Sequence, residues 1–222
     1  LYTEQYPGGA IAIANHLSDF CKSLTFASML GEDAEHEKFI IDSLPHNIEH
    51  YFIYKKNSPT ITKKRYVDNV SNSKNLGVYS MNDEQMIQEN EEELHSFIND
   101  NINDFDLVIV SDYGHGFISK KTAELISKKS NFISVNAQIN AANIGFHTMN
   151  NYFNADCAII NETEIRHELR DRNGSLESLM KTLVNNLQLN TLIVTSGSQG
   201  ATLYNSSKNK FYYCPAFASK IV

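Results

Sequence analysis

Long apolar runs and paired cysteines are both missing from this sequence of 222 residues. No apolar stretch approaches the roughly 20 residues that a membrane-spanning helix needs. Residues 1–6 include neither the basic nor the apolar segment of a signal peptide. The three cysteines have no CxxC spacing, which is typical of reduced thiols in the cytosol. We therefore expect a cytoplasmic protein with no membrane partner.

Positive charge is also scarce. The chain has 19 Lys and Arg against 26 Asp and Glu, and its formal net charge is −7. Domains that bind nucleic acid normally carry a basic face, so we expect no nucleic-acid partner. The hydrophobic share of 41% is close to the globular norm, which excludes a disordered, collagen-like or coiled-coil chain. The length suits one domain with its own core.

Several familiar site motifs are absent as well. The sequence has no GxxxxGK[ST] phosphate loop, no GxGxxG and no GxSxG. These absences argue against a P-loop nucleotide hydrolase, a dinucleotide-binding fold and an acyl-transfer serine. His46 and His50 lie four residues apart without a convincing third ligand, so we interpret them as surface histidines rather than a zinc site.

The sequence alternates between predicted strands and helices. The apolar strands at 106–110, 132–135, 157–160 and 191–195 are separated by predicted helices at 120–129, 162–171 and 176–187, and 201–204 with 210–214 favour a closing hairpin. Such an alternation predicts an α/β fold with a mostly parallel sheet covered on both faces.

The first half of the chain is less regular. We predict helices at 10–20, 34–43 and 83–102 and a strand at 24–29. Segment 51–80 breaks the alternation, because its β-rich runs at 51–56 and 60–68 flank an Asn-Ser-Pro turn, a pattern typical of two strands around a turn. We interpret 51–80 as a small β-rich lid insertion, and 1–50 with 81–222 as the core.

In parallel sheets ligands bind beyond the carboxyl ends of the strands, so the residues that follow the strands are the candidates for a site. Asp112 follows the first of the regular strands and precedes two glycines. Its carboxylate either contacts a polar ligand or orders the turn and caps the next helix.

Two later strand ends leave similar alternatives open. Asn161 and Glu164 have the spacing of a capping box, and their oxygens also suit the water shell of Mg²⁺. Gly197 and Gly200, with flanking hydroxyls, are typical either of a phosphate-binding loop or of a plain hairpin turn. Near the start, Gly8 and Gly9 precede a helix whose N-terminus suits a polar or anionic ligand.

Taken in order, these segments resemble the ribokinase-like (PfkB) carbohydrate kinase family. Residues 7–10 (PGGA) are similar to its sugar-binding di-glycine signature, 30–33 (LGED) to its G-x-D, and 111–116 (SDYGHG) to its SDY-x-K-G, with His115 in place of Lys. Residues 161–164 (NETE) match N-x-x-E, and 195–201 (TSGSQGA) resemble its nucleotide loop. Residues 59–65 resemble the lid strand of kinases that phosphorylate heptose 7-phosphate.

The resemblance implies a three-layer ribokinase-like fold and ATP-dependent phosphoryl transfer to a sugar or sugar phosphate, with Mg²⁺. It implies sugar contacts from Gly8, Gly9, Asp33 and Asp112, and contacts from the lid by Lys63 and Arg65, a cationic pair that suits a phosphorylated substrate. It also implies nucleotide contacts from Thr195, Gly197 and Gly200, and orientation of the Mg²⁺ water shell by Asn161 and Glu164.

The sequence departs from the family pattern in several places. Ala12 stands where the family has a sugar-contacting Asn, and Asn136 stands where relatives often have Asp. No residue matches the Asp base of the family's G-A-G-D motif, and residues 214–222 resemble the strand that leads into it. The family's first strand, with its sugar-binding Asp, has no counterpart either. We therefore expect this chain to be part of a longer kinase and inactive by itself.

Two further expectations follow from the resemblance. Lids of relatives commonly pair between subunits, and exposed strand edges tend to be covered, so we expect a homodimer through the lid. The alternative to a kinase is a non-catalytic module of the same fold that binds a sugar or nucleotide.

Overall fold

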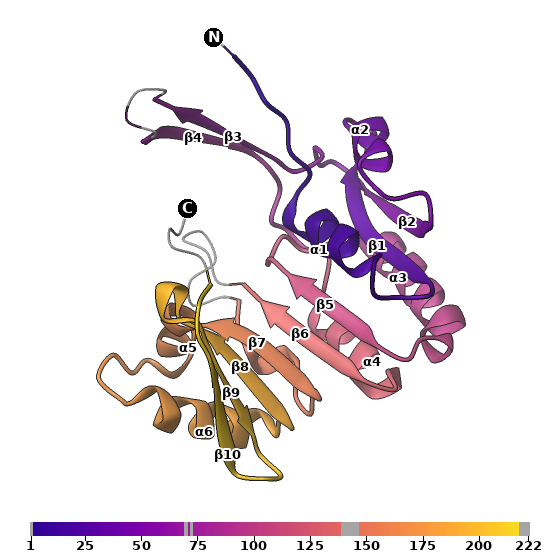
Figure 1. Ribbon diagram of the computed structural model, residues 1–222. Helices are drawn as coiled ribbons and strands as arrows, with labels where there is room; N and C mark the ends of the chain where they lie inside the picture. The colour runs from indigo at the N-terminus through magenta and orange to yellow at the C-terminus, as the bar shows by residue number, and fades with distance from the viewer. Residues whose placement is uncertain (1, 69–70, 72, 139–146, 218–222) are drawn as a thin grey trace. The chain divides into compact units, whose positions relative to one another are not determined.

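The computed structural model describes residues 2–68, 71, 73–138 and 147–217, and the chain forms two compact units (Figure 1). Unit 1 contains Leu1–Leu94 and His115–Phe117, and unit 2 contains His95–Gly114 and Ile118–Val222. This division differs from the predicted core and lid, because all of the lid and the first 50 residues belong to unit 1. Each unit is described separately below.

Unit 1 is built around a pair of parallel strands. Strand β1 (Leu24–Gly31) pairs with β2 (Ile48–Lys55), starting with Leu24 opposite Ile48. Helix α1 (Gly9–Leu17) contacts β1, and α2 (Glu37–Asp42) lies between the two strands in the sequence. Ile11 and Ala14 lie three residues apart on one face of α1, so both reach the core. The buried apolar cluster comprises Ile11, Ala14, Phe26, Leu30, Leu44, Ile48 and Phe52.

A separate antiparallel hairpin completes unit 1. Strand β3 (Thr62–Val67) pairs with β4 (Lys74–Ser80), and almost every residue of the two strands is exposed. The sequence predicted that the run at 51–56 and the run at 60–68 would form two strands around a turn. Among the described residues, the first run instead belongs to β2 and pairs with β1, because its apolar side chains complete the core beside that strand.

Unit 2 is built around a six-stranded sheet with the order β10-β9-β8-β7-β6-β5. The neighbouring pairs from β5 to β8 are parallel, and β9 and β10 are antiparallel additions at one side. The strands are β5 (Val108–Asp112), β6 (Ile133–Ala137), β7 (Cys157–Asn161), β8 (Thr191–Thr195), β9 (Ala201–Asn205) and β10 (Lys210–Cys214).

The helices of unit 2 connect the parallel strands. They are α4 (Lys120–Lys129), α5 (Glu162–Leu169) and α6 (Leu176–Leu187), with short 3-10 turns at η1 (Ile102–Asp104), η2 (Met149–Asn151) and η3 (Gly197–Gln199). The Ser119 side chain caps α4 and the Ser175 side chain caps α6, each accepting an N–H of the first turn. Such capping fixes where each helix begins.

Helix α3 (Gln88–Asn101) begins in unit 1 and ends in unit 2. The sequence predicted a helix from residue 83, but residues 83–87 lie before its first turn. In the described part of the chain, no helix combines the length and the apolar content required to cross a membrane.

Candidate functional site

The di-glycine stands at the beginning of α1 in unit 1. Gly8 is the N-cap residue, with an extended backbone, and Gly9 is the first helical residue. Both are exposed. A Cβ added to Gly8 would meet no atom within 4 Å, so the fold gives this position no steric reason to be glycine. The space beside Gly8 is therefore open to a ligand, as the predicted sugar contact requires.

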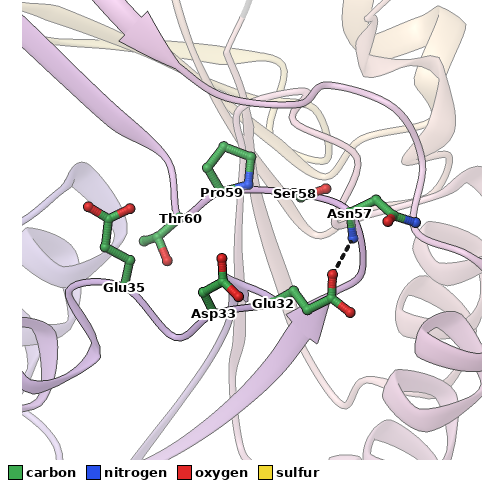
Figure 2. Close-up of a pocket in the computed structure, with 7 residues that line it drawn as sticks. All are labelled: Glu32, Asp33, Glu35, Asn57, Ser58, Pro59 and Thr60. Atoms are coloured by element: carbon green, nitrogen blue, oxygen red, sulfur yellow. Dashed lines mark hydrogen bonds between the residues drawn. The ribbon is translucent and has the colours of Figure 1, made fainter.

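Asp33 lies in a pocket of unit 1 of about 230 Å³ (Figure 2). The lining residues are Glu32, Asp33, Glu35, Asn57, Ser58, Pro59 and Thr60. Ionised carboxylates only accept hydrogen bonds, so three of them suit a ligand rich in hydroxyl groups. The sequence singled out Asp33 alone. Glu32 and Glu35 were not singled out from the sequence, and only the fold shows that they line the same pocket.

Gly31 allows the two walls of this pocket to meet. A Cβ at Gly31 would lie 2.2 Å from Thr60 N and 2.3 Å from Pro59 C. The Gly31 N–H donates to Thr60 Oγ1 at 3.0 Å, and the Glu32 N–H donates to Ser58 O at 3.0 Å. Segment 57–60 is therefore fixed directly against the turn that carries Asp33.

Lys63 and Arg65 are exposed residues of β3, two positions apart. Alternate residues of a strand point to the same side, so both cations belong to one face of the hairpin. Lys63 pairs with Tyr79 and Arg65 with Gly77 on β4. Lys63 Nζ lies 3.2 Å from Nε2 of His115, a contact that the sequence did not predict.

The ends of β7 and β8 bring two predicted motifs together in unit 2. The strands are parallel, and Asn161 lies opposite Thr195 in their register. Beyond them, the Ser196 hydroxyl donates to Glu162 Oε2 at 2.9 Å. A hydrogen bond from the Arg166 side chain holds the pKa of Glu162 below its usual range, and the hydrogen bond from the Ser196 hydroxyl adds a smaller effect in the same direction. Neighbouring parallel strands thus place the NETE segment and the predicted nucleotide loop side by side.

Asn161 and Glu164 form a complete capping box at the start of α5. Asn161 Oδ1 accepts the Glu164 N–H at 2.8 Å, and Glu164 Oε2 accepts the Asn161 N–H at 2.9 Å. The structural role that the sequence allowed is therefore present. An amide or carboxylate oxygen has more than one lone pair, and Glu164 is buried, with 5% of its surface exposed. Among the described residues, no group of three His, Cys, Asp or Glu has metal-binding geometry.

The loop after β8 contains the two predicted glycines. Gly197 and Gly200 both have positive φ, 55° and 91°. A Cβ at Gly200 would lie 2.0 Å from Cys214 O, so this glycine also lets the end of β10 approach the loop. Thr195 is exposed at the end of β8. These residues form one compact turn next to Glu162.

Asp112 is buried, with 4% of its surface exposed, at the end of β5. Its Oδ1 accepts the Gly114 N–H at 3.0 Å and its Oδ2 accepts the Tyr152 hydroxyl at 2.6 Å. His147 Nε2 lies 3.6 Å from the same Oδ2. Burial, reinforced by this carboxylate, raises the pKa of Tyr152. The turn-ordering role is therefore present, while the predicted substrate contact stays a prediction.

The predicted residues fall into two sets. Unit 1 contains Gly8, Gly9, Asp33, Lys63 and Arg65, and unit 2 contains Asp112, Asn161, Glu164, Thr195, Gly197 and Gly200. Within unit 2 the last five gather at the ends of two adjacent strands. Of the segment predicted to lead into the base motif, residues 218–222 lie outside the described part of the chain.

A comparison with known protein families identifies the family of this chain. The model of the pfkB family of carbohydrate kinases matches residues 2–222. The chain belongs to this family. Curated relatives include the bifunctional protein HldE of Campylobacter jejuni subsp. doylei, 25% identical over 203 residues, which cover 90% of this chain and 41% of that protein. HldE of C. jejuni strain RM1221 is 24% identical over 201 residues, with 89% and 41% covered. The chain thus spans about two fifths of these relatives.

Solved structures confirm the ribokinase-like α/β fold. Phosphofructokinase-2 from Escherichia coli in complex with fructose-6-phosphate matches with a TM-score of 0.70 at 15% identity, covering 96% of this chain and 69% of that one. Ribokinase from Giardia lamblia matches with a TM-score of 0.61 at 16% identity, covering 89% and 61%. At these identities the likeness concerns the fold alone.

Proposed function

We propose that this pfkB-family chain belongs to a kinase that transfers the γ-phosphoryl group of ATP to a hydroxyl of a sugar or sugar phosphate. The observation that carries the proposal is the family match, which extends over residues 2–222. The chemistry of both units supports it. Phosphoryl transfer requires positioning and charge neutralisation more than covalent chemistry, and the side chains present are suited to both.

On the substrate side, Gly8, Gly9 and Asp33 would contact sugar hydroxyls. The open space at Gly8 and the acidic pocket around Asp33 support this assignment. Lys63 and Arg65 would bind an anionic group from the hairpin, which we propose to be a lid. Asp112 would contact the substrate while it keeps its hydrogen bonds to Gly114 and Tyr152.

On the nucleotide side, Thr195, Gly197 and Gly200 would border ATP. Asn161 and Glu164 supply hard oxygen atoms next to that loop, which fits Mg²⁺ bound through its water shell. When bound, Mg²⁺ would neutralise charge on the phosphates. The residues themselves would orient water molecules from a fixed position, because the capping box holds both side chains at the start of α5.

We further propose a phosphorylated heptose, heptose 7-phosphate, as the substrate. The two cations on one face of β3 support a substrate that already carries phosphate, and the resemblance of residues 59–65 to the lid strand of kinases that phosphorylate heptose 7-phosphate supports this choice. A cytoplasmic location and the inactivity of residues 1–222 in isolation stay predictions.

The test is ADP release by the complete protein that contains residues 1–222, with ATP, Mg²⁺ and a panel of sugars and sugar phosphates. We expect one sugar phosphate to raise ADP release, and Lys63→Ala to raise the KM for it by about tenfold, the loss of one charge-assisted hydrogen bond. Ser207→Ala, in the turn between β9 and β10, is the control and should change neither kcat nor KM. Binding without any turnover would favour the non-catalytic module.

A further inference from the structure

A buried lysine, Lys55, joins the loop after β4 to the segment that contains His115. Lys55, the last residue of β2, has 3% of its surface exposed. Its Nζ donates to the carbonyl oxygens of Asn82 at 2.6 Å, Glu84 at 2.5 Å and His115 at 3.4 Å. Burial lowers the pKa of Lys55, and the carboxylates of Asp83 and Glu84 oppose that shift. A buried ammonium that donates to three carbonyls holds their loops together.

Gly116 brings the same two segments into contact. Its φ is +83°, and a Cβ there would lie 1.9 Å from Glu84 O. The Met86 N–H donates to Gly116 O at 3.3 Å. The loop that follows β4 is therefore packed directly against residues 115–117. Any side chain at residue 116 would force them apart.

The His115 ring links the loop after β4 to Lys63 on β3. The residue is buried, with 8% of its surface exposed. Nδ1 lies 2.7 Å from Asp83 Oδ1, and Nε2 lies 3.2 Å from Lys63 Nζ. A charged ammonium has only donors, so Nε2 must accept from Lys63. Nδ1 then carries the ring proton and donates to Asp83, which assigns a neutral ring with one tautomer.

We propose that His115 is a positioning residue: with Asp83 fixing its tautomer, it holds the Lys63 ammonium in place for an anionic group of the substrate and makes binding of that group depend on pH. This inference rests on the proposed function, because it takes Lys63 as the ligand of the substrate anion. Neither Asp83 nor His115 was singled out as a site residue from the sequence.

The pH dependence has a definite sign. When the ring is protonated, Nε2 becomes a donor and can no longer accept from Lys63. Lys63 from β3 and Asp83 from the loop after β4 contact the ring itself. The cation of Lys55, at the end of β2, contacts the backbone carbonyl of His115, and the carboxylates of Asp83 and Glu84 act on Lys55. The imidazolium and the Lys63 ammonium repel each other at close range. Acidification therefore releases Lys63, and affinity for the anion falls.

The first experiment examines the ring without any substrate. Nitrogen-15 NMR of the histidine side chains at pH 8 should show His115 protonated at Nδ1 and not at Nε2. Lys63→Met should shift the Nε2 resonance, and the control Lys208→Met, in the exposed turn between β9 and β10, should not. A ring protonated at Nε2 in the wild type would overturn the inference.

The second experiment measures binding of heptose 7-phosphate and of the unphosphorylated heptose by calorimetry at pH 8 and pH 5.5. In the wild type, only the phosphate ester should bind about tenfold more weakly at the lower pH, the value of one charge-assisted hydrogen bond. His115→Leu should show the weaker affinity at both values. His115→Gln, whose amide oxygen accepts without titrating in this range, should retain the affinity and lose the pH dependence. His167→Gln, an exposed substitution in α5, should behave as the wild type.

These outcomes separate the inference from the proposed function. Equal binding of the phosphate ester by the wild type and His115→Leu at both pH values would overturn the inference and leave the proposed function standing. Failure of the wild type to bind either compound at any pH would count against the proposed function, and the inference would fall with it. Loss of binding in His115→Gln as well as His115→Leu, with unchanged thermal stability, would also overturn the positioning role.

Discussion

At the scale of single residues, the space around a glycine's missing Cβ shows whether the fold or a ligand could require glycine at that position. Gly31 is required by the fold, since a Cβ would lie 2.2 Å from the backbone of Thr60. Gly8 has open space around its missing Cβ. If Gly8 is important, the reason is the close approach of a ligand to its backbone. The two positions can therefore be distinguished by comparing stability with binding.

We predict that Gly31→Ala lowers the free energy of unfolding by about 1–3 kcal/mol, the cost of overpacking a fixed backbone contact. Gly8→Ala should change it by less than about 0.5 kcal/mol, as for an exposed position, and should weaken sugar binding. Urea unfolding and calorimetry measure the two effects. A Gly8→Ala protein that binds sugar like the wild type would remove Gly8 from the proposed site.

At the scale of elements, the start of α5 combines a structural role with a proposed functional one. The capping box satisfies N–H groups at the helix terminus, and one of its two residues, Asn161, lies opposite Thr195 in the strand register. A substitution that keeps the cap but shortens the side chain separates these roles. Serine caps a helix about as well as asparagine, but its oxygen reaches less far.

We predict that Asn161→Ala lowers the free energy of unfolding by about 1 kcal/mol and that Asn161→Ser leaves it nearly unchanged. Both variants should bind ATP more weakly than the wild type in the presence of Mg²⁺. Without Mg²⁺, their ATP affinities should differ less from that of the wild type. The measurements are urea unfolding and nucleotide titration with and without the metal. If both variants bind ATP with Mg²⁺ as tightly as the wild type, Asn161 has a capping role alone.

The sequence predicted the elements of unit 2 well because its signals are local. The helix predicted at 120–129 and the strand at 191–195 have the observed bounds, since a serine cap and a short apolar run mark them directly. The partner of a strand is not a local property. The run at 51–56 was recognised as β-rich, but the parallel pairing of β2 with β1 depends on a core shared by Phe26 and Phe52.

The candidate site shows the same limit. Motif order singled out Asp33, Asn161 and Gly200 as candidates, because each occupies a fixed place in a short pattern, and their roles stay predictions. The contact of Lys63 with His115 joins residues 52 positions apart, and Lys55 is one lysine among several in its region. Its burial follows from the meeting of the end of β2 with the loop after β4 and the segment that contains His115, which no spacing in the sequence records.

At the scale of the whole molecule, the hairpin bears on assembly. Tyr66 lies opposite Leu76, and Lys64 lies opposite Val78, so Tyr66, Leu76 and Val78 share the face away from Lys63 and Arg65. Their exposed fractions are 52%, 55% and 47%. A two-stranded hairpin with this much exposed apolar surface is marginal in isolation. We propose that a second copy of the lid covers this face in a homodimer.

We therefore predict a dimer in analytical ultracentrifugation and a shift towards monomer in Leu76→Lys, because the added ammonium would have to be buried at the interface. Ser207→Lys adds the same charge at an exposed turn and serves as the control. A wild-type protein that sediments as a monomer at high concentration would exclude the lid dimer.

Phosphoryl transfer to a sugar can be followed by labelling the phosphoryl group that moves. The complete protein that contains residues 1–222 would be incubated with ATP labelled in its γ-phosphoryl group, Mg²⁺ and heptose 7-phosphate or another sugar phosphate of the panel. We expect the label to appear in the sugar product and Asn161→Ala to slow its appearance. Label found only in inorganic phosphate, or retained in ATP with every sugar and sugar phosphate tested, would exclude sugar kinase activity towards these compounds.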